Sequence, residues 1–346
     1  MTVVEEATGT PTRHPAYTAF ADVVERVLVP AAVEVDATEV PQSHLDALAE
    51  CGFWGWTVPA AHGGMPVPPA VHAAAVELLF GACPSTALIA SQHTGPIQHA
   101  LRVGSPELLG LLPGLASGAR IGAGAFGHVR SWPERASVTA TRRPGGYRFD
   151  GVVPWLSGWG VVDVAWMGAV DDERREIVFA LVDVPAPETR ATPLRLAAIQ
   201  GSRTVSVALD GLQVPAERVV QVIDVDVWKA ADGTTLPSGL PAPPGPAGLA
   251  RAALADALRQ RPGEPSLLAL AAQVEAAART AQPGPASRAE LAELAVRATT
   301  AAVVARGGAA LGLDDVAQVR ARAALFLQVR GLSPAVRSAE LARWAR

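Results

Sequence analysis

Apolar residues recur along the chain with two different periods, and the change of period divides the sequence into three zones. In residues 17–118 they follow the i, i+3, i+4 spacing of a helix that has one buried face. In residues 121–222 the period falls to two, which is typical of strands. The segments with the strongest strand pattern are 136–141, 177–184 and 204–209. From residue 249 onward, Ala and Leu return to helical spacing.

This order predicts an α+β fold that is mainly α. We expect an N-terminal helical domain, a central antiparallel β-barrel domain and a shortened C-terminal helical bundle. The predicted segments are a flexible tail 1–14, a helical domain 15–120, a β-barrel domain 121–223, a Pro/Gly-rich linker 224–248 and a helical bundle 249–346.

Four local signals refine this outline. Pro30 predicts the end of the first helix, because an interior proline removes a backbone donor. Ser105-Pro106-Glu107 predicts a helix start, with a cap, a proline and an acid in favourable positions. Asp150-Gly151 predicts a two-residue hairpin turn. The stretch "LPSGLPAPPGPAG", residues 236–248, is expected to hold no regular helix.

Composition excludes several classes of protein. The 346 residues suggest two or three domains, and 49% hydrophobic with 18% charged residues indicate a globular chain. A net charge of −4 argues against nucleic acid as a partner. Cys51 and Cys83 form no C-x-x-C pair, so neither a disulfide framework nor a metal site is expected. The polar N-terminus and the lack of a long uninterrupted apolar run favour a cytoplasmic protein without a membrane partner.

Several stretches, in this order, resemble the acyl-CoA dehydrogenase superfamily of flavoproteins. "CGFWGWTVPAAHGG" at 51–64 is similar to the family's helix, glycine and VP-x-x-x-GG loop. Residues 77–126 follow the family's succession of helices up to the start of the sheet. "YRFDGVVPWLSG" at 147–158 resembles the segment that ends in Trp, an aliphatic residue and Thr or Ser. "GSRTVSVALDGLQVPAERVV" at 201–220 resembles the closing strands. The resemblance covers most of the chain.

The resemblance implies bound FAD. Its flat isoalloxazine ring needs an apolar wall and hydrogen-bond donors at the rim. Trp155 would supply the wall and Ser157 the donor, while Leu156 would point into the barrel. Phe126 and Gly127 occupy the region where the family carries Thr-Glu-Pro beside the flavin. Without the surrounding motifs, the interpretation of Trp-Leu-Ser would be a cross-strand aromatic pair followed by an exposed serine.

The sequence departs from the family at the catalytic base. The glutamate that removes the substrate's α-proton precedes a glycine near the C-terminus, and Arg330 stands in the matching place before Gly331. Arginine cannot accept a proton at neutral pH. The other family location falls in the broken stretch 236–248. The catalytic residue is therefore unknown, and the sequence does not rank the candidate replacements His128, Glu264 and Glu340.

A second departure concerns the diphosphate of FAD. The family's Arg-x-x-Phe-Gly element appears as "RQRPGEPSLL", without Phe-Gly. Gly307 and Gly308 remain from the later glycine pair and would allow the backbone to approach a pyrophosphate, although a simple helix interruption explains them equally well.

The function implied is an FAD-dependent α,β-dehydrogenation of an acyl thioester of CoA or of a carrier protein, in a homo-dimer or tetramer. Two alternatives stay open: a flavin-dependent monooxygenase, for which no α-proton base is needed, and a degenerate binding homologue. A helical scaffold without a small-molecule site would leave Trp155 and Ser157 facing solvent.

Overall fold

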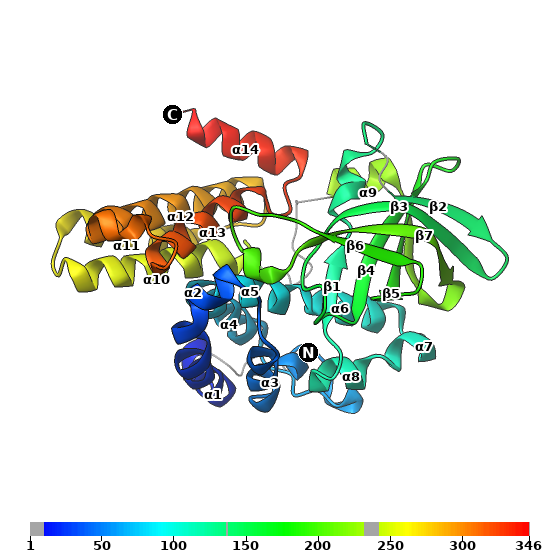
Figure 1. The fold of residues 1–346 in the computed structure, drawn as a ribbon, viewed down its shortest axis with the longest axis horizontal. Coiled ribbons are helices and arrows are strands. Elements are labelled where there is room, and N and C mark those ends of the chain that lie inside the picture. Colours follow the sequence, from blue (N-terminus) through cyan, green and yellow to red (C-terminus); the bar gives the residue numbers. More distant parts are fainter. Residues whose placement is uncertain (1–9, 136–137, 232–241, 346) are drawn as a thin grey trace, which may run out of the picture.

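The fold consists of N-terminal helices, a central sheet and C-terminal helices that pack side by side. A computed structural model describes residues 10–135, 138–231 and 242–345 (Figure 1). The chain runs from the blue helices at the base, through the green sheet on the right, to the orange and red helices on the left (Figure 1). Most of the predicted tail, residues 1–9, lies outside the described part.

The N-terminal region is helical. Its α-helices are α1 (Pro15–Val23), α2 (Val29–Ala37), α3 (Gln42–Glu50), α4 (Pro69–Ala82), α5 (Pro84–Gln92), α6 (Thr94–Val103), α7 (Pro106–Leu109) and α8 (Leu112–Ser117). Ser105 caps α7 as predicted, because its hydroxyl accepts a hydrogen bond from the Leu108 N–H. Helix α5 is the central element of this region, and seven of its nine residues are buried.

Pro30 does not end the first helix, so that prediction is wrong. A π-helical turn, Val24–Leu28, follows α1 and leads directly into α2, where Pro30 falls in the first turn. The Val29 N–H bonds the Val24 carbonyl five residues back, so the hydrogen-bond ladder is already shifted by the π-turn where Pro30 lacks its N–H.

The central region is a mainly antiparallel sheet. Its strands are β1 (Gly122–Ala125), β2 (Val138–Arg143), β3 (Gly146–Leu156), β4 (Val164–Asp171), β5 (Glu176–Asp183), β6 (Thr189–Pro193), β7 (Val205–Pro215) and β8 (Val219–Asp224). Their order is β6-β7-β3-β2-β4-β5-β8, and β1 pairs with β4 in parallel. The three strongest strand predictions overlap β2, β5 and β7.

The sheet is open, and the predicted closed barrel is wrong. The edge strands β6 and β8 do not pair with each other in the described residues. The two halves of the sheet meet at β2 and β4, which pair at Thr139 and Val170 and nowhere else among the described residues. A barrel needs a continuous ladder around its circumference. Here β1 pairs with Val164 to Met167 of β4, the stretch of β4 that a continuous β2–β4 ladder would need.

Asp150-Gly151 does not form the predicted hairpin turn. The turn lies earlier, between the ends of β2 and β3, where Arg143 pairs with Gly146. Strand β3 continues through Asp150 and Gly151 with a change of register against β7. Gly151 has a φ of 126°, which only glycine adopts easily. The extra residue lies on β7, where the three steps from Leu212 to Leu209 face the two steps from Phe149 to Gly151, so the β-bulge belongs to β7.

The C-terminal region contains α10 (Pro244–Gln260), α11 (Pro265–Thr280), α12 (Pro285–Arg306), α13 (Val316–Val329) and α14 (Pro334–Trp344). The predicted linker is partly helical, since α9 (Val225–Ala231) and the first turn of α10 fall inside 224–248. Prolines at the start of α10 fit a helix N-terminus, where the missing N–H costs nothing. Residues 232–241 of the linker lie outside the described part.

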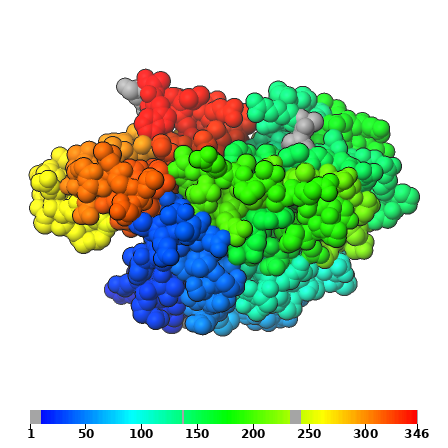
Figure 2. Space-filling model, in the orientation of Figure 1, coloured from blue at the N-terminus to red at the C-terminus, as the bar shows by residue number. Residues whose placement is uncertain are grey.

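Packing ties the three regions together. One cluster of buried side chains draws on the N-terminal helices, the sheet and the C-terminal helices, and the three coloured regions meet over one surface in Figure 2. Arg322 on α13 pairs with Asp36 on α2 at 2.7 Å, and Arg320 donates to the Gly81 carbonyl of α4 at 2.9 Å.

One helical segment, Pro285–Leu311, is long and apolar enough to cross a membrane by length and composition alone. That is weak evidence, because the core helix of a soluble protein passes the same test. Within the fold, α12 packs against α10, α11, α13 and α14. The absence of a membrane partner stays a prediction.

Candidate functional site

The end of strand β3 presents an indole to solvent. The register against β7 shifts between Val153 and Leu156, which adds one residue to the strand. Plain alternation would turn Trp155 inward beside Val153, but the extra residue reverses it. Trp155 is 58% exposed, whereas Leu156 is fully buried. The sheet irregularity is therefore what frees the Trp155 face for a flat ligand.

Ser157 belongs to a chain of three hydroxyl groups. Its Oγ lies 2.7 Å from Thr204 Oγ1, and Thr204 Oγ1 lies 2.9 Å from Ser202 Oγ. Three hydroxyls carry three protons, and two of them are used within the chain. Ser202 is fully buried, so a Ser202 proton without an acceptor would be costly.

The favoured direction of the chain is therefore Ser202 to Thr204 to Ser157. Each hydroxyl then donates to the next, and the proton left over belongs to half-buried Ser157. Hydrogen bonds in such a chain polarise one another. The arrangement gives Ser157 a strengthened donor at the end of β3, beside Trp155.

The last turn of helix α5 touches three parts of this region. A Cβ at Gly158, next to Ser157, would lie 3.4 Å from Ile89 Cγ1. Gln92 Oε1 accepts from the Gly124 N–H of β1 at 3.0 Å. Ser91 Oγ accepts from Arg330 Nη2 at 2.8 Å. One helical turn, about 5 Å long, thus connects β3, β1 and the end of α13.

Phe126 and Gly127 lie near β3 but play different parts. Gly127 is exposed and begins a 3-10 turn, Gly127–Ser131, that lies beside β3. The half-buried Phe126 ring packs against Trp166, with centroids 4.1 Å apart, and Arg130 lies 5.2 Å from its centroid. The Phe126 side chain is therefore engaged within a second apolar cluster, and the backbone of 126–127 is the part available to a ligand.

Arg330 ends α13 beside α4 and α5. Its guanidinium lies 5.4 Å from the Phe80 centroid in addition to the bond with Ser91. Burial, together with the charge of Arg288, lowers the pKa of Arg330 to about 10, so it remains a cation at neutral pH. Where the resemblance places a proton acceptor, the structure places a group that only donates.

None of the three candidate bases lies at the end of β3. His128 Nε2 is 2.8 Å from the Gly168 carbonyl, and burial lowers its pKa to about 4. Glu264 caps α11 by accepting from the Ser266 N–H. Glu340 is buried on α14, which packs against α12, and desolvation raises its pKa to about 7. The catalytic base therefore stays unidentified.

Gly307 and Gly308 lie apart from this region, in a 3-10 turn, Gly307–Leu311, after α12. Both are exposed, and a Cβ at either would meet nothing within 4 Å. Gly307 has a φ of 76°, so the pair ends α12 whether or not it also meets a ligand.

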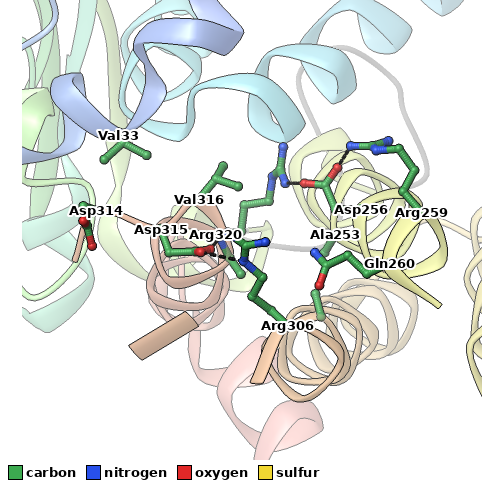
Figure 3. A pocket seen from close by; sticks show the side chains of 12 residues that line it. Val33, Ala253, Asp256, Arg259, Gln260, Arg306, Asp314, Asp315, Val316 and Arg320 are labelled. Carbon is green, nitrogen blue, oxygen red and sulfur yellow. Dashed lines mark hydrogen bonds and ion pairs between the residues drawn. The ribbon is translucent and has the colours of Figure 1, made fainter. Parts of the chain in front are cut away.

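A cavity of about 390 Å³ lies between α10, α12 and α13 (Figure 3). Its three guanidiniums are already paired: Arg306 with Asp315 at 2.9 Å, and Arg259 and Arg320 with Asp256. Asp314 adds a further carboxylate to the lining. A second cavity of about 310 Å³, between α11, α12 and α14, does not reach β3 either.

Sequence reasoning missed the partners of Ser157 and Arg330. Ser202 and Thr204 lie within "GSRT", a stretch that carried the resemblance, and two hydroxyl residues at i and i+2 before a strand were the available signal. Ser91 gave no signal in the sequence, because its contact with Arg330 joins residues 239 positions apart.

Comparison with known proteins finds a family match for the N-terminal region and solved structures with the same fold. Residues 10–119 match the family model of the acyl-CoA dehydrogenase N-terminal domain. The whole chain also has the fold of butyryl-CoA dehydrogenase from Megasphaera elsdenii, with a TM-score of 0.80, 19% identity, and coverage of 99% of this chain and 100% of that one. Residues 10–119 therefore match this domain family, and the chain as a whole has the fold of an acyl-CoA dehydrogenase.

Other solved structures share the fold at similarly low identity. Acyl-CoA dehydrogenase from Geobacillus kaustophilus matches with a TM-score of 0.77 and 15% identity, over 95% of this chain and 96% of that one. The prolyl acyl carrier protein oxidase AnaB matches with a TM-score of 0.75 and 14% identity, over 95% and 98%. A search among curated proteins finds no significant match.

The residues at β3 fit the ring of a superfamily flavin, and the residues of the large cavity do not fit its diphosphate. Trp155 offers an exposed apolar face, and half-buried Ser157 offers a hydroxyl at the end of the chain from Ser202. The cavity guanidiniums are held by carboxylates of this chain, and a diphosphate would meet those same carboxylates. Any diphosphate contacts therefore have to come from elsewhere.

Proposed function

We propose that this protein is an FAD-dependent oxidoreductase that acts on an acyl group held as a thioester. The observation that carries the proposal is the exposed Trp155 beside half-buried Ser157, whose hydroxyl ends a hydrogen-bonded chain that begins at buried Ser202. Superfamily structures that share this fold include butyryl-CoA dehydrogenase and prolyl acyl carrier protein oxidase. They support a thioester substrate of CoA or of a carrier protein. We further propose that the protein acts in the cytoplasm as a homo-dimer or tetramer.

The chain's own residues have defined parts in this proposal. A bound flavin supplies the acceptor for a hydride. Trp155 covers one face of the ring, and Ser157 donates a hydrogen bond to its rim. The exposed Gly127 backbone borders the ring on the side of the 3-10 turn. Ile89 supports Gly158 from behind, which holds the end of β3 in place.

A second candidate is a flavin enzyme whose reaction needs no α-proton base, such as an oxygen-dependent hydroxylation. The observation that favours it is Arg330, a permanent cation at the position where a carboxylate is expected. In the α,β-dehydrogenation, a positioned carboxylate elsewhere would have to take the α-proton. Neither His128 nor Glu264 is placed to do so.

Anaerobic mixing of the purified protein with acyl thioesters tests the first candidate. We expect a yellow protein whose flavin spectrum bleaches when a short-chain acyl-CoA is added. Ser157→Ala should weaken both flavin binding and bleaching, because it removes the donor at the ring, while exposed Ser338→Ala on α14 should behave as wild type.

The outcomes separate the candidates. Bleaching by the thioester supports the dehydrogenase. A yellow protein that bleaches only with a reductase and NADH, and then consumes oxygen, supports the hydroxylating enzyme. A folded, colourless protein that takes up no added FAD contradicts both.

A further inference from the structure

Strand β1 is held along its second edge by two side chains from the junction of α5 and α6. Its first edge pairs with β4. Successive N–H groups of a strand point to opposite edges, so the N–H groups of Gly122 and Gly124 share the second edge. The Gly122 N–H donates to His93 Nδ1 at 3.0 Å, and the Gly124 N–H donates to Gln92 Oε1 at 3.0 Å. Two neighbouring side chains thus take the place of a strand partner.

The amide of Gln92 is fixed at both ends. Its Nε2 donates to the Leu88 carbonyl of its own helix at 3.3 Å, which turns Oε1 toward β1. A Cβ at Gly124 would lie 3.5 Å from Gln92 Oε1 and 3.4 Å from Phe126 Cε1. The Gln92 amide and the Phe126 ring therefore both lie close to the Gly124 backbone.

His93 anchors the first half of the same strand in the core. Its Nδ1 accepts from β1, so Nε2 carries the proton and donates to the Leu115 carbonyl at 3.1 Å. Burial lowers the pKa of His93 to about 4, which keeps the ring neutral and Nδ1 free to accept at neutral pH. The second half of β1, next to Phe126, has half-buried Gln92 in the corresponding place.

The bond from Gln92 lies close to the backbone that borders the ring in the proposed function. Only Ala125 and Phe126 separate Gly124 from exposed Gly127, a span of about 10 Å in an extended chain. Without the Gln92 acceptor, the half-buried Gly124 N–H would have to find water. That requires the edge of β1 to move away from α5, and the backbone of 126–127 moves with it.

We propose that Gln92 is a positioning residue for the flavin, which holds the backbone of Phe126 and Gly127 at the ring through the Gly124 N–H. Gln92 itself does not touch the ring. A binding site whose backbone is already in place loses less freedom when the ligand arrives, so the bond to Gly124 strengthens flavin binding. This role rests on the proposed function, because it needs a ring beside residues 126–127.

Titration of FAD into flavin-stripped Gln92→Met tests the role. Methionine keeps the length of the side chain and has only a weak acceptor. We expect the Kd for FAD to rise about three- to tenfold, the range for one lost hydrogen bond. At saturating FAD, the visible band of the bound flavin should shift toward that of free FAD, because the polar contacts at the ring change. Gln92→Glu keeps an acceptor oxygen at the same distance and should restore both the Kd and the band.

Hydrogen exchange of the flavin-free protein gives a readout that needs no bound ring. The amides of residues 124–127 should exchange faster in Gln92→Met than in wild type, because the edge of β1 is released. Gln92→Asn keeps the amide but is one methylene too short to reach Gly124. It should show the same three changes even if Gln92→Met fails to fold.

A matched control separates positioning from general destabilisation. Gln98, on α6, is a half-buried glutamine that forms no hydrogen bond among the described residues, so Gln98→Met should behave as wild type. A purely structural role for Gln92 would lower the melting temperature and leave the Kd and the flavin band unchanged. A wild-type Kd and band in Gln92→Met, unchanged exchange at 124–127, or no rescue by Gln92→Glu overturns the proposal.

The wild-type sample separates this role from the proposed function. A yellow wild type whose FAD binding is unaffected by Gln92→Met keeps the redox proposal and loses the positioning role. A colourless wild type that takes up no FAD overturns both.

Discussion

Replacing Thr204 with Val removes the middle hydroxyl of the Ser202–Thr204–Ser157 chain while keeping the shape of the side chain. Two hydrogen bonds are lost, at 2.7 Å and 2.9 Å. Half-buried Ser157 can bond water instead, so its loss is small. Ser202 is fully buried, and an unsatisfied buried donor costs about 1–3 kcal/mol. We expect Thr204→Val to lower the free energy of unfolding by about 2 kcal/mol.

A double-mutant cycle isolates the cause of that loss. Ser202→Ala removes the orphaned donor, and replacing both partners of a buried hydrogen bond is close to neutral. The double variant Ser202→Ala/Thr204→Val should therefore be more stable than Thr204→Val alone by about 1 kcal/mol or more. Urea unfolding gives the four free energies if the m-value stays constant. Equal stability of Thr204→Val and wild type, or strictly additive losses, would refute the proposed direction of the chain.

Two further variants test the electrostatics and the packing of the C-terminal helices. Desolvation raises the pKa of Glu340 from 4.5 to about 7 in the folded state, so the contribution of this carboxyl is complete below about pH 4.5 and is lost as the pH rises towards 7. In urea unfolding, Glu340→Gln should match wild type at pH 4 and be more stable than wild type by about 1–3 kcal/mol at pH 8. Exposed Glu50→Gln serves as the control. The same stability difference between Glu340→Gln and wild type at both pH values would contradict this prediction. Gly248 on α10 has no room for a side chain, because a Cβ would overlap the Glu77 carbonyl of α4. Gly248→Ala should lower the melting temperature by an amount equivalent to about 1–3 kcal/mol. Gly308 has open space around it, so Gly308→Ala should change stability by less than about 0.5 kcal/mol. Similar effects of the two substitutions would count against this packing of α10 on α4.

The order of helices and strands could be predicted from the sequence because each element carries its own period. Ser105 capped its helix as expected, since a cap depends on residues three positions apart. Pro30 was misread because a π-helical turn carries the helix past it, and Asp150-Gly151 because the pair stays within β3 opposite a β-bulge of β7. Local propensity does not report such insertions when the surrounding fold imposes them.

The site was only partly predictable. Trp155 and Ser157 were found through a motif, but the exposure of Trp155 depends on the bulge in β3. The join between the two halves of the sheet rests on the pairing of Thr139 with Val170, which no local pattern encodes. The hydroxyl chain and the bond between Arg330 and Ser91 join residues that are distant in sequence and become visible only in three dimensions.

The central claim is that a flavin ring binds against Trp155. Titrating FAD into flavin-stripped protein, and following the change in the visible flavin spectrum, tests it directly. The account predicts stoichiometric binding by the wild type and at least tenfold weaker binding by Trp155→Ala, because losing an aromatic wall removes more than about 1.4 kcal/mol. Trp344→Ala, which changes a similarly exposed indole on α14, should bind FAD as wild type does. Equal FAD affinity of Trp155→Ala and wild type, or no binding by either, would contradict the claim.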